Sequence, residues 1–317
     1  IHPDQEHLYY LKTSSDNFSQ QLWVKNMQTA MLKRVDLKHA ISNIIAIVEE
    51  DNKETTTLLF LEKFKDRCGI FKSTLPKPRH AVQTSKHTVK LFDCNNKRIK
   101  DLDYHKQQQA IFYTAQPKNF WPNQIYSFDL KTKKHNLVTQ VEPIGWGHHG
   151  IDISPDGEKL LIMSTNSDHK TQLLSLNLLT NEIVEGIKFN RPVYEAIWHH
   201  DSEQVYYYSQ PPARQIIKSE LNGENATALI STSEELSSQM SRMPDDNNLL
   251  FSTEHKNYDN RWLTNVDGLS RISNSTVSEF SPAMFHNSDL FLFASERSGQ
   301  IQLYLSNSTK EETKIVS

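Results

Sequence analysis

Eight residues with ligand-binding side chains occur just before, or at the start of, strands that recur along the sequence. They comprise an indole, two imidazoles, a guanidinium, a phenol, two carboxylates and an amide: Trp146, His148, His149, Arg191, Tyr194, Glu195, Gln239 and Glu279. Gathered on one face, such side chains would form a polar mouth for a small molecule or another protein. The alternative is that they are ordinary loop residues that satisfy strand ends, and the sequence alone leaves both interpretations open.

Catalytic motifs are missing from the sequence. It contains no G-x-S-x-G, P-loop, H-E-x-x-H or G-x-G-x-x-G pattern. The paired carboxylates at 49–50 and 245–246 fall in expected turns, where solvated charge explains them. We therefore predict a protein that is not an enzyme and that needs no cofactor.

Two histidine pairs, at 148–149 and 199–200, raise the question of a metal site. Neighbouring residues on a strand point to opposite faces, so each pair offers one ligand in a given direction. The two pairs also occupy different positions of the repeat. We therefore expect no metal site.

The elements that must position these residues are short strands that recur with a regular step. A turn, an apolar strand and a strand that begins with Gln follow one another, as at 154–157, 160–163 and 172–174. The Gln recurs at 21, 124, 172, 215 and 302, with Arg261 in one copy, and the steps from position 124 onward are 48, 43, 46 and 41 residues. A four-stranded propeller blade takes ~40–45 residues. The sequence predicts an all-β fold, a β-propeller of four-stranded antiparallel blades.

The turn at 154–157 reads Ser-Pro-Asp-Gly. Pro presets φ at the first corner, Asp caps the turn with its side chain, and Gly tolerates the positive φ that follows. This composition predicts a type I turn between the innermost and second strands of a blade. Other copies keep the position and lose the Gly, so the turn is inferred there from the repeat alone.

Length and charge limit the classes of function. Closed all-β folds of 317 residues commonly form one domain. The 35 basic and 38 acidic residues give a net charge of −3, so we expect no nucleic-acid binding by this domain. The sequence has no run of ~18 apolar residues, so any membrane attachment would come from a segment outside this chain.

We predict a single propeller domain over residues 1–317. Residues 1–35 form the first blade, residues 36–75 a second, and residues 104–317 hold the regular blades. Residues 76–103 are either irregular or a shortened blade, which makes the number of blades seven or eight, and we favour seven. The sequence starts without Met and ends after a fourth strand, so we expect a fragment of a longer protein.

The two cysteines, Cys68 and Cys94, both fall in the least regular region. They are compatible with a single bridge in an oxidising compartment or with two isolated buried thiols. No Cys/His spacing typical of zinc accompanies them.

The repeat carries a family likeness. Ser281-Pro282-Ala283, the turn at 295–300 and Gln302-Leu303-Tyr304 resemble the TolB-type β-propeller repeat, and residues 124–126 and 154–157 match the same pattern. The likeness covers most of 104–307, part of 1–35 and little of 36–103. It is specific for the fold and weak for function, because function lies on loops grafted to a fold.

Propellers of this type occur in three settings. The composition, rich in Gln, Asn, Lys and Ser, is most similar to the periplasmic propeller region of CadC/ToxR-like membrane-anchored winged-helix transcription regulators. Free TolB-like periplasmic proteins and the gating propellers of prolyl-oligopeptidase-like serine peptidases are the alternatives. The resemblance implies a periplasmic sensor or protein-interaction domain of an inner-membrane protein. Its partner would be an envelope protein or a small ligand at the funnel mouth, and a homodimer stays open.

Overall fold

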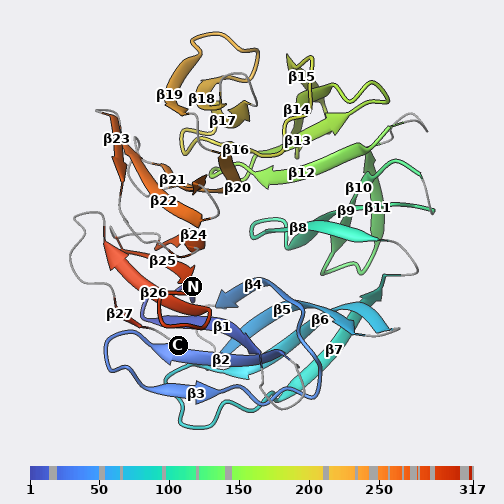
Figure 1. Cartoon of the computed structure of the whole chain (residues 1–317). Coiled ribbons are helices and arrows are strands. Elements are labelled where there is room, and N and C mark those ends of the chain that lie inside the picture. Colours follow the sequence, from blue (N-terminus) through green and yellow to red (C-terminus); the bar gives the residue numbers. More distant parts are fainter. Residues whose placement is uncertain are drawn as a thin grey trace.

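The described residues of the computed structural model form seven antiparallel sheets around a common centre (Figure 1). Six sheets have four strands and one has three. This confirms the predicted all-β propeller. The structure describes residues 1–13, 20–49, 54–64, 67–94, 98–118, 121–139, 145–209, 214–232, 235–242, 249–255, 258–265, 268–271, 277, 279–285, 290–307 and 314–315.

The strands follow the chain blade by blade, with the innermost strand first. The first three blades comprise β1 (His7–Thr13), β2 (Gln20–Asn26) and β3 (Leu32–Arg34); β4 (Asn43–Glu49), β5 (Thr55–Phe64), β6 (Arg67–Pro76) and β7 (His87–Asp93); and β8 (Ile99–His105), β9 (Ala110–Ala115), β10 (Gln124–Asp129) and β11 (His135–Thr139). The next two comprise β12 (Gly147–Ile153), β13 (Lys159–Thr165), β14 (Thr171–Asn177) and β15 (Ile183–Lys188); and β16 (Ala196–Trp198), β17 (Gln204–Ser209), β18 (Arg214–Glu220) and β19 (Thr227–Thr232). The last two comprise β20 (Glu235–Arg242), β21 (Leu249–His255), β22 (Tyr258–Asn265) and β23 (Gly268–Arg271); and β24 (Glu279–Met284), β25 (Leu290–Ser295), β26 (Gln302–Asn307) and β27 (Lys314–Ile315).

The second strand of a blade carries most of the core. All six residues of β9 are buried, because each face of this strand packs against a neighbouring blade. On one face, Phe112 of β9 belongs to a cluster with Leu160 and Ile162 of β13. Full burial of such a side chain stabilises the fold by about 1.5–3 kcal/mol. The apolar runs that mark the repeat are therefore the contacts between blades.

The predicted turn is present in three copies of the repeat. Gly157 has φ +78°, and its N–H donates to the carbonyl oxygen of Ser154 at 2.8 Å. The same position holds Gln5 (φ +59°) and Ser202 (φ +61°), each donating to the carbonyl three residues earlier at 3.0 and 3.1 Å. The turn is thus kept where Gly is lost, with a side chain in the left-handed region that is uncommon for residues other than Gly.

Residues 76–103 do not form a blade of their own in the described structure. They contain β7, the fourth strand of the second blade, and β8, the inner strand of the third. The second blade therefore continues to Asp93 instead of ending at residue 75. The repeat is stretched here because residues 77–86 leave the blade and contact the first one. The N–H of Asp36 donates to the carbonyl of Gln83 at 2.8 Å, and Lys33 Nζ donates to that of Pro78 at 3.1 Å.

A disulfide joins Cys68 on β6 to Cys94, the residue after β7. Their Cα atoms are 5.4 Å apart and their positions are separated by 26 residues. The bridge therefore closes a loop that includes the whole excursion over 77–86. Of the two alternatives that the sequence left open, the structure has the bridge.

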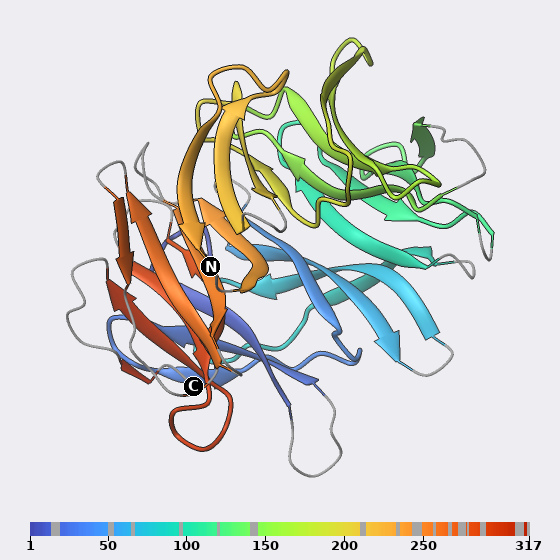
Figure 2. The same cartoon turned by 45° about the horizontal axis from the view of Figure 1, so that its top comes forward.

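The ring closes by side-chain packing between the last and first blades. Both views show β24–β27 beside β1–β3 (Figures 1 and 2). Leu8 and Tyr10 of β1 form a buried cluster with Phe285 and Leu292. The described part of the last blade contains its own fourth strand, β27, so the two blades share no strand.

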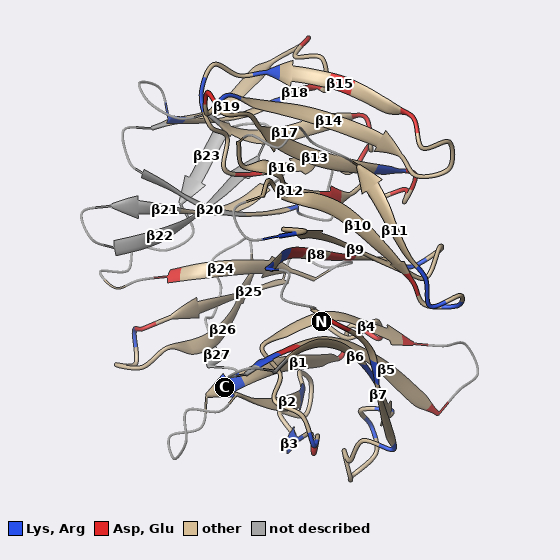
Figure 3. Cartoon of the chain, turned by 90° about the vertical axis from the view of Figure 1, so that its right-hand side faces the viewer, with Lys and Arg blue, Asp and Glu red and all other residues tan. Residues whose placement is uncertain are grey.

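Both signs of charge are distributed over the blades in the view of Figure 3. None of the described residues forms a helix that is long and apolar enough to cross a membrane.

Candidate functional site

The inner strands of three successive blades, β8, β12 and β16, lie around the centre of the ring (Figure 1). Residues on or next to these strands line a cavity of about 250 Å³. We call it the inner-strand cavity. Its lining residues are Asp101, Gly150, Ile151, Met163, Tyr194, Glu195, Ala196 and Ile197. The structure therefore brings together Tyr194 and Glu195, which the sequence singled out, with Asp101, which it did not.

Close packing of two blades shapes the wall of the inner-strand cavity. Gly150 lies at a bulge of β12 with φ +55°, and its N–H donates to Oδ2 of Asp101 at 3.0 Å. A Cβ at this position would lie 1.9 Å from Cε of Met163. Any other residue here would displace the end of the Met163 side chain and would have to adopt a left-handed backbone. Tyr194, at the rim, is 47% exposed.

Carboxylates on the inner strands, or one residue before them, tie successive blades together. Each accepts a backbone N–H from the inner strand of the following blade, because those N–H groups have no strand partner on the channel side. The pairs are Asp101 with Gly150 (3.0 Å), Asp103 with Ile153 (3.0 Å), Asp152 with Trp198 (2.7 Å) and Glu195 with Met240 (2.9 Å). The cavity is thus built on a repeated polar contact between blades.

These carboxylates carry more negative charge than their surroundings compensate. Burial, reinforced by the charge of Asp152, raises the pKa of Asp103 to about 6. Burial is also the main reason that the pKa of Glu195 is raised to about 7, with Asp152 acting in the same direction. Burial raises the pKa of Asp152 as well, although Nη1 of Arg242 lies 2.6 Å from its Oδ2. The guanidinium of Arg242 thus lowers the pKa values of Asp152 and Asp103, but burial outweighs it at both carboxylates.

Glu195 has one carboxylate oxygen without a described partner. Its Oε1 accepts the N–H of Met240, whereas Oε2 is buried from solvent and makes no hydrogen bond to any described residue. A buried acceptor in this condition costs about 1–3 kcal/mol relative to one that is bonded. The Glu195 carboxylate therefore has hydrogen-bonding capacity that no described group uses.

The raised pKa of Glu195 predicts an unusual pH dependence of stability. Its folded value of about 7 exceeds the ordinary 4.5, so ionisation disfavours the folded state, and this contribution lowers stability as pH rises from about 4.5 to 7. Glu195→Gln should remove the effect. We expect the free energy of unfolding of the variant, relative to wild type, to increase by about 3 kcal/mol between pH 4.5 and pH 8.

Urea denaturation over this pH range measures the difference. Glu203→Gln makes the same chemical change at an exposed position elsewhere, so it is the matched control. If both variants follow the pH profile of the wild type, the assigned environment of Glu195 is wrong.

Trp146 and His149 form a second group just before and at the start of β12. Trp146 is 45% exposed, and its ring centroid lies 5.4 Å from that of His169 and 6.4 Å from that of His149. Nε2 of His149 is 2.7 Å from Oγ1 of Thr165. Burial lowers the pKa of His149, against the charge of Asp101, so its imidazole is neutral at pH 7. These groups can bind by stacking and hydrogen bonding.

The other predicted residues do not line the inner-strand cavity. His148 is buried, and Glu279 is 0% exposed, where its carboxylate contacts the guanidinium of Arg297 and lies 3.3 Å from Oγ of Ser295. Arg191 is exposed. Gln239 belongs to β20, and its side chain lies outside the described residues. The binding roles predicted for these residues stay predictions.

Sequence reasoning missed Asp101, Asp103, Asp152 and Arg242, which lie within the inner strands rather than before them. One available signal was the spacing between each carboxylate and the N–H that it accepts. That spacing is 49, 50, 46 and 45 residues in the four pairs, which is one repeat.

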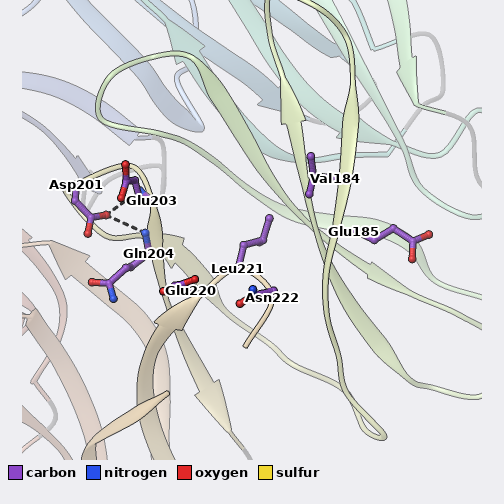
Figure 4. A pocket seen from close by; sticks show the side chains of 8 residues that line it. All are labelled: Val184, Glu185, Asp201, Glu203, Gln204, Glu220, Leu221 and Asn222. Atoms are coloured by element: carbon purple, nitrogen blue, oxygen red, sulfur yellow. Dashed lines mark hydrogen bonds between the residues drawn. The ribbon is translucent and has the colours of Figure 1, made fainter. Parts of the chain in front are cut away.

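A larger hollow of about 460 Å³ lies between β15 and the turns that follow β16 and β18 (Figure 4). Its lining residues are Val184, Glu185, Asp201, Glu203, Gln204, Glu220, Leu221 and Asn222. Most of its carboxylates have local partners. Asp201 accepts the N–H groups of Glu203 and Gln204 at 2.8 and 2.9 Å, Lys188 Nζ lies 2.8 Å from Glu185, and Asn225 donates to Glu220 at 2.6 Å. This acidic groove is therefore a solvated surface with its charge largely satisfied.

Among the described residues, no three His, Cys, Asp or Glu side chains are grouped as a metal ion would require.

The fold is shared with several solved structures at low sequence identity. An oligogalacturonate lyase from Vibrio parahaemolyticus matches with a TM-score of 0.63 and 13% identity, over 98% of this chain and 84% of that one. A prolyl endopeptidase matches with a TM-score of 0.67 and 10% identity over 98% of this chain, which spans only 48% of that protein. TolB from Acinetobacter baumannii matches with a TM-score of 0.55 and 12% identity, over 98% and 80% of the two chains.

The sequence matches no family model and no curated protein. The similarity to TolB supports the predicted TolB-type propeller fold, and at these identities the likeness extends to the fold alone.

Proposed function

We propose that this chain is a non-catalytic binding propeller, the extracytoplasmic sensor or protein-interaction domain of a bacterial membrane-anchored transcription regulator. The observation that carries the binding role is the inner-strand cavity, where Asp101 of one blade and Tyr194 and Glu195 of another converge, with Ile151 of the blade between them in the wall. Concave sites with a few convergent polar groups and perturbed pKa values are where ligands usually bind.

The disulfide supports a location outside the cytoplasm. Such bridges form and persist in oxidising compartments and are rare where thiols are kept reduced. Cys68 and Cys94 are joined, so the periplasm suits this domain. The regulator assignment rests on the resemblance of the sequence, and the similarity to TolB supports it only at the level of the fold.

In the proposed mechanism, ligand binding shifts the equilibrium of the domain between monomer and homodimer. A ligand in the inner-strand cavity, or an envelope protein seated over it, would contact three blades at once. It would favour whichever arrangement of the domain, monomer or homodimer, holds these blades in the binding geometry. The shift can be no larger than the difference in affinity for the two states.

Two other assignments use the same fold. A free TolB-like periplasmic protein would need no membrane segment, and a gating propeller of a serine peptidase would be followed by a hydrolase domain. The fold is similar to that of a prolyl endopeptidase, of which this chain spans 48%, and this similarity supports the peptidase propeller as an alternative. The parent gene separates them. A winged helix and membrane span favour the regulator, and a G-x-S-x-G domain favours the peptidase.

A thermal-shift screen of the chain against periplasmic metabolites, peptides and envelope-protein fragments tests the binding role. We expect a saturable thermal shift with at least one probe. Tyr194→Ala should weaken the affinity for that probe at least tenfold, because Tyr194 is half-exposed at the cavity rim. Leu179→Ala, at an 87% exposed apolar position, is the control and should leave binding unchanged. A shift that Tyr194→Ala leaves intact, or none with any probe, would contradict binding at this cavity.

A further inference from the structure

The inner-strand cavity has a strong chemical asymmetry. Of the eight residues that line it, two are carboxylates and none is basic. Asp152 lies close enough to raise the pKa of Glu195. Arg242 is 2.6 Å from Asp152 and donates also to the carbonyl oxygen of Trp198 at 3.2 Å, so its guanidinium is already engaged. Buried charges are stable only when they are paired, so the cavity favours a cation.

The remaining lining atoms restrict which cation fits. Ile151, Met163 and Ile197 are apolar, and the phenol ring of Tyr194 stands at the rim. Such a wall suits a hydrocarbon stem whose charged end reaches a carboxylate, as lysine side chains do at apolar surfaces. An aromatic ring adds attraction to a cation above it. The volume, about 250 Å³, is below the range of drug-sized sites and suits a small group.

We propose that the inner-strand cavity binds an alkylammonium group, supplied by a free amine or by a lysine side chain of a protein partner. Its three N–H donors would bond to the carboxylates of Glu195 and Asp101, both of which line the cavity. Such charge-assisted bonds are stronger than those of a neutral donor such as water. The proposal deepens the proposed function and rests on it, because it names the ligand class of the same cavity.

The site carries its own pH dependence. Binding requires ionised Glu195, whose pKa is about 7, so affinity should rise about tenfold between pH 6 and pH 8. The charged and titratable groups that face it are Asp101 and Asp103 from β8, His149 and Asp152 from β12, the neighbouring Tyr194, and Arg242 from β20. Burial lowers the pKa of His149, and Asp103, with a pKa of about 6, changes charge at the lower end of this range.

Isothermal titration of the whole chain with n-butylammonium chloride tests the proposal. n-Butanol at equal concentration, in sodium chloride of matched ionic strength, is the neutral analogue. We expect saturable binding of the amine only, weakened at least tenfold by Glu195→Gln and by Asp101→Asn. Glu203→Gln in the acidic groove should bind like wild type. A peptide with one central lysine, compared with the same peptide carrying glutamine, separates a protein-borne ammonium from the free amine.

Each outcome decides the proposal. Equal binding of butanol and butylammonium, an equal effect of Glu203→Gln, or no binding of either ammonium source, with the cavity holding water only, would overturn it. Either Glu195→Gln or Asp101→Asn is informative if the other fails to fold. A neutral or anionic ligand that binds in the screen and depends on Tyr194 would refute the ammonium class while the binding function stands. No ligand of any class would remove both.

Discussion

Arg242→Met is expected to destabilise the fold by about 3–5 kcal/mol, because it leaves Asp152 buried without its counter-charge. Nη1 of Arg242 lies 2.6 Å from Oδ2 of Asp152, and the two side chains are largely buried between β12 and β20. The variant also loses the bond to the carbonyl of Trp198 at 3.2 Å. Arg242 also lowers the pKa of Asp103, so the stability lost on substitution, relative to wild type, should be larger at pH 8 than at pH 5.

The measurement is urea denaturation at pH 7, with Asp152→Asn/Arg242→Met as the companion variant. Asparagine can still accept the N–H of Trp198, which bonds to Asp152 at 2.7 Å. Replacing both charges removes the unpaired carboxylate, so the double variant should recover most of the loss. A single variant within about 1 kcal/mol of wild type, or a double variant as unstable as the single one, would show that the pair does not compensate buried charge.

The fold could be predicted from the sequence because its determinants are local and repeated. The apolar run that became β9 and the Ser-Pro-Asp-Gly turn at 154–157 each specify their own structure within a few residues. A repeat multiplies such signals, so turns that had lost their glycine, at Gln5 and Ser202, could be inferred by position. The region over 36–103 resisted because its irregularity is non-local. Ten-residue strands and the contact between Asp36 and Gln83 leave no periodic pattern.

The candidate site was half visible from the sequence. Tyr194 and Glu195 were found because loops before inner strands converge in any propeller. Asp103 and Asp152 were missed because a charged residue within a strand usually marks a solvated face. Only closure of the ring places each of them against the N–H of the next blade. Glu279 lies at the start of an inner strand, as predicted, but it does not line the cavity. Its carboxylate is bound by Arg297, which reaches it from the hairpin after β25.

Replacing both cysteines, Cys68→Ser with Cys94→Ser, is expected to destabilise the protein by about 3 kcal/mol. In the chain-entropy account, a bridge limits the unfolded state by an amount that grows slowly with loop length. Here the separation is 26 residues. The same loop holds Gln83, which bonds to Asp36 beyond β3, so a looser loop should also weaken the contact between the first two blades.

Urea denaturation of wild type with and without a reductant, beside the double serine variant, measures this effect. Reduced wild type and the double variant should lose stability equally, and a thiol titration of the unfolded, unreduced wild type should find no free thiol. Unchanged stability on reduction would show that the bridge does not constrain the fold. The thiol titration bears on the compartment separately: two free thiols in the unreduced wild type would remove the main support for an oxidising compartment, because such bridges form and persist there. An equal loss in both would show that the bridge stabilises the fold by closing this loop.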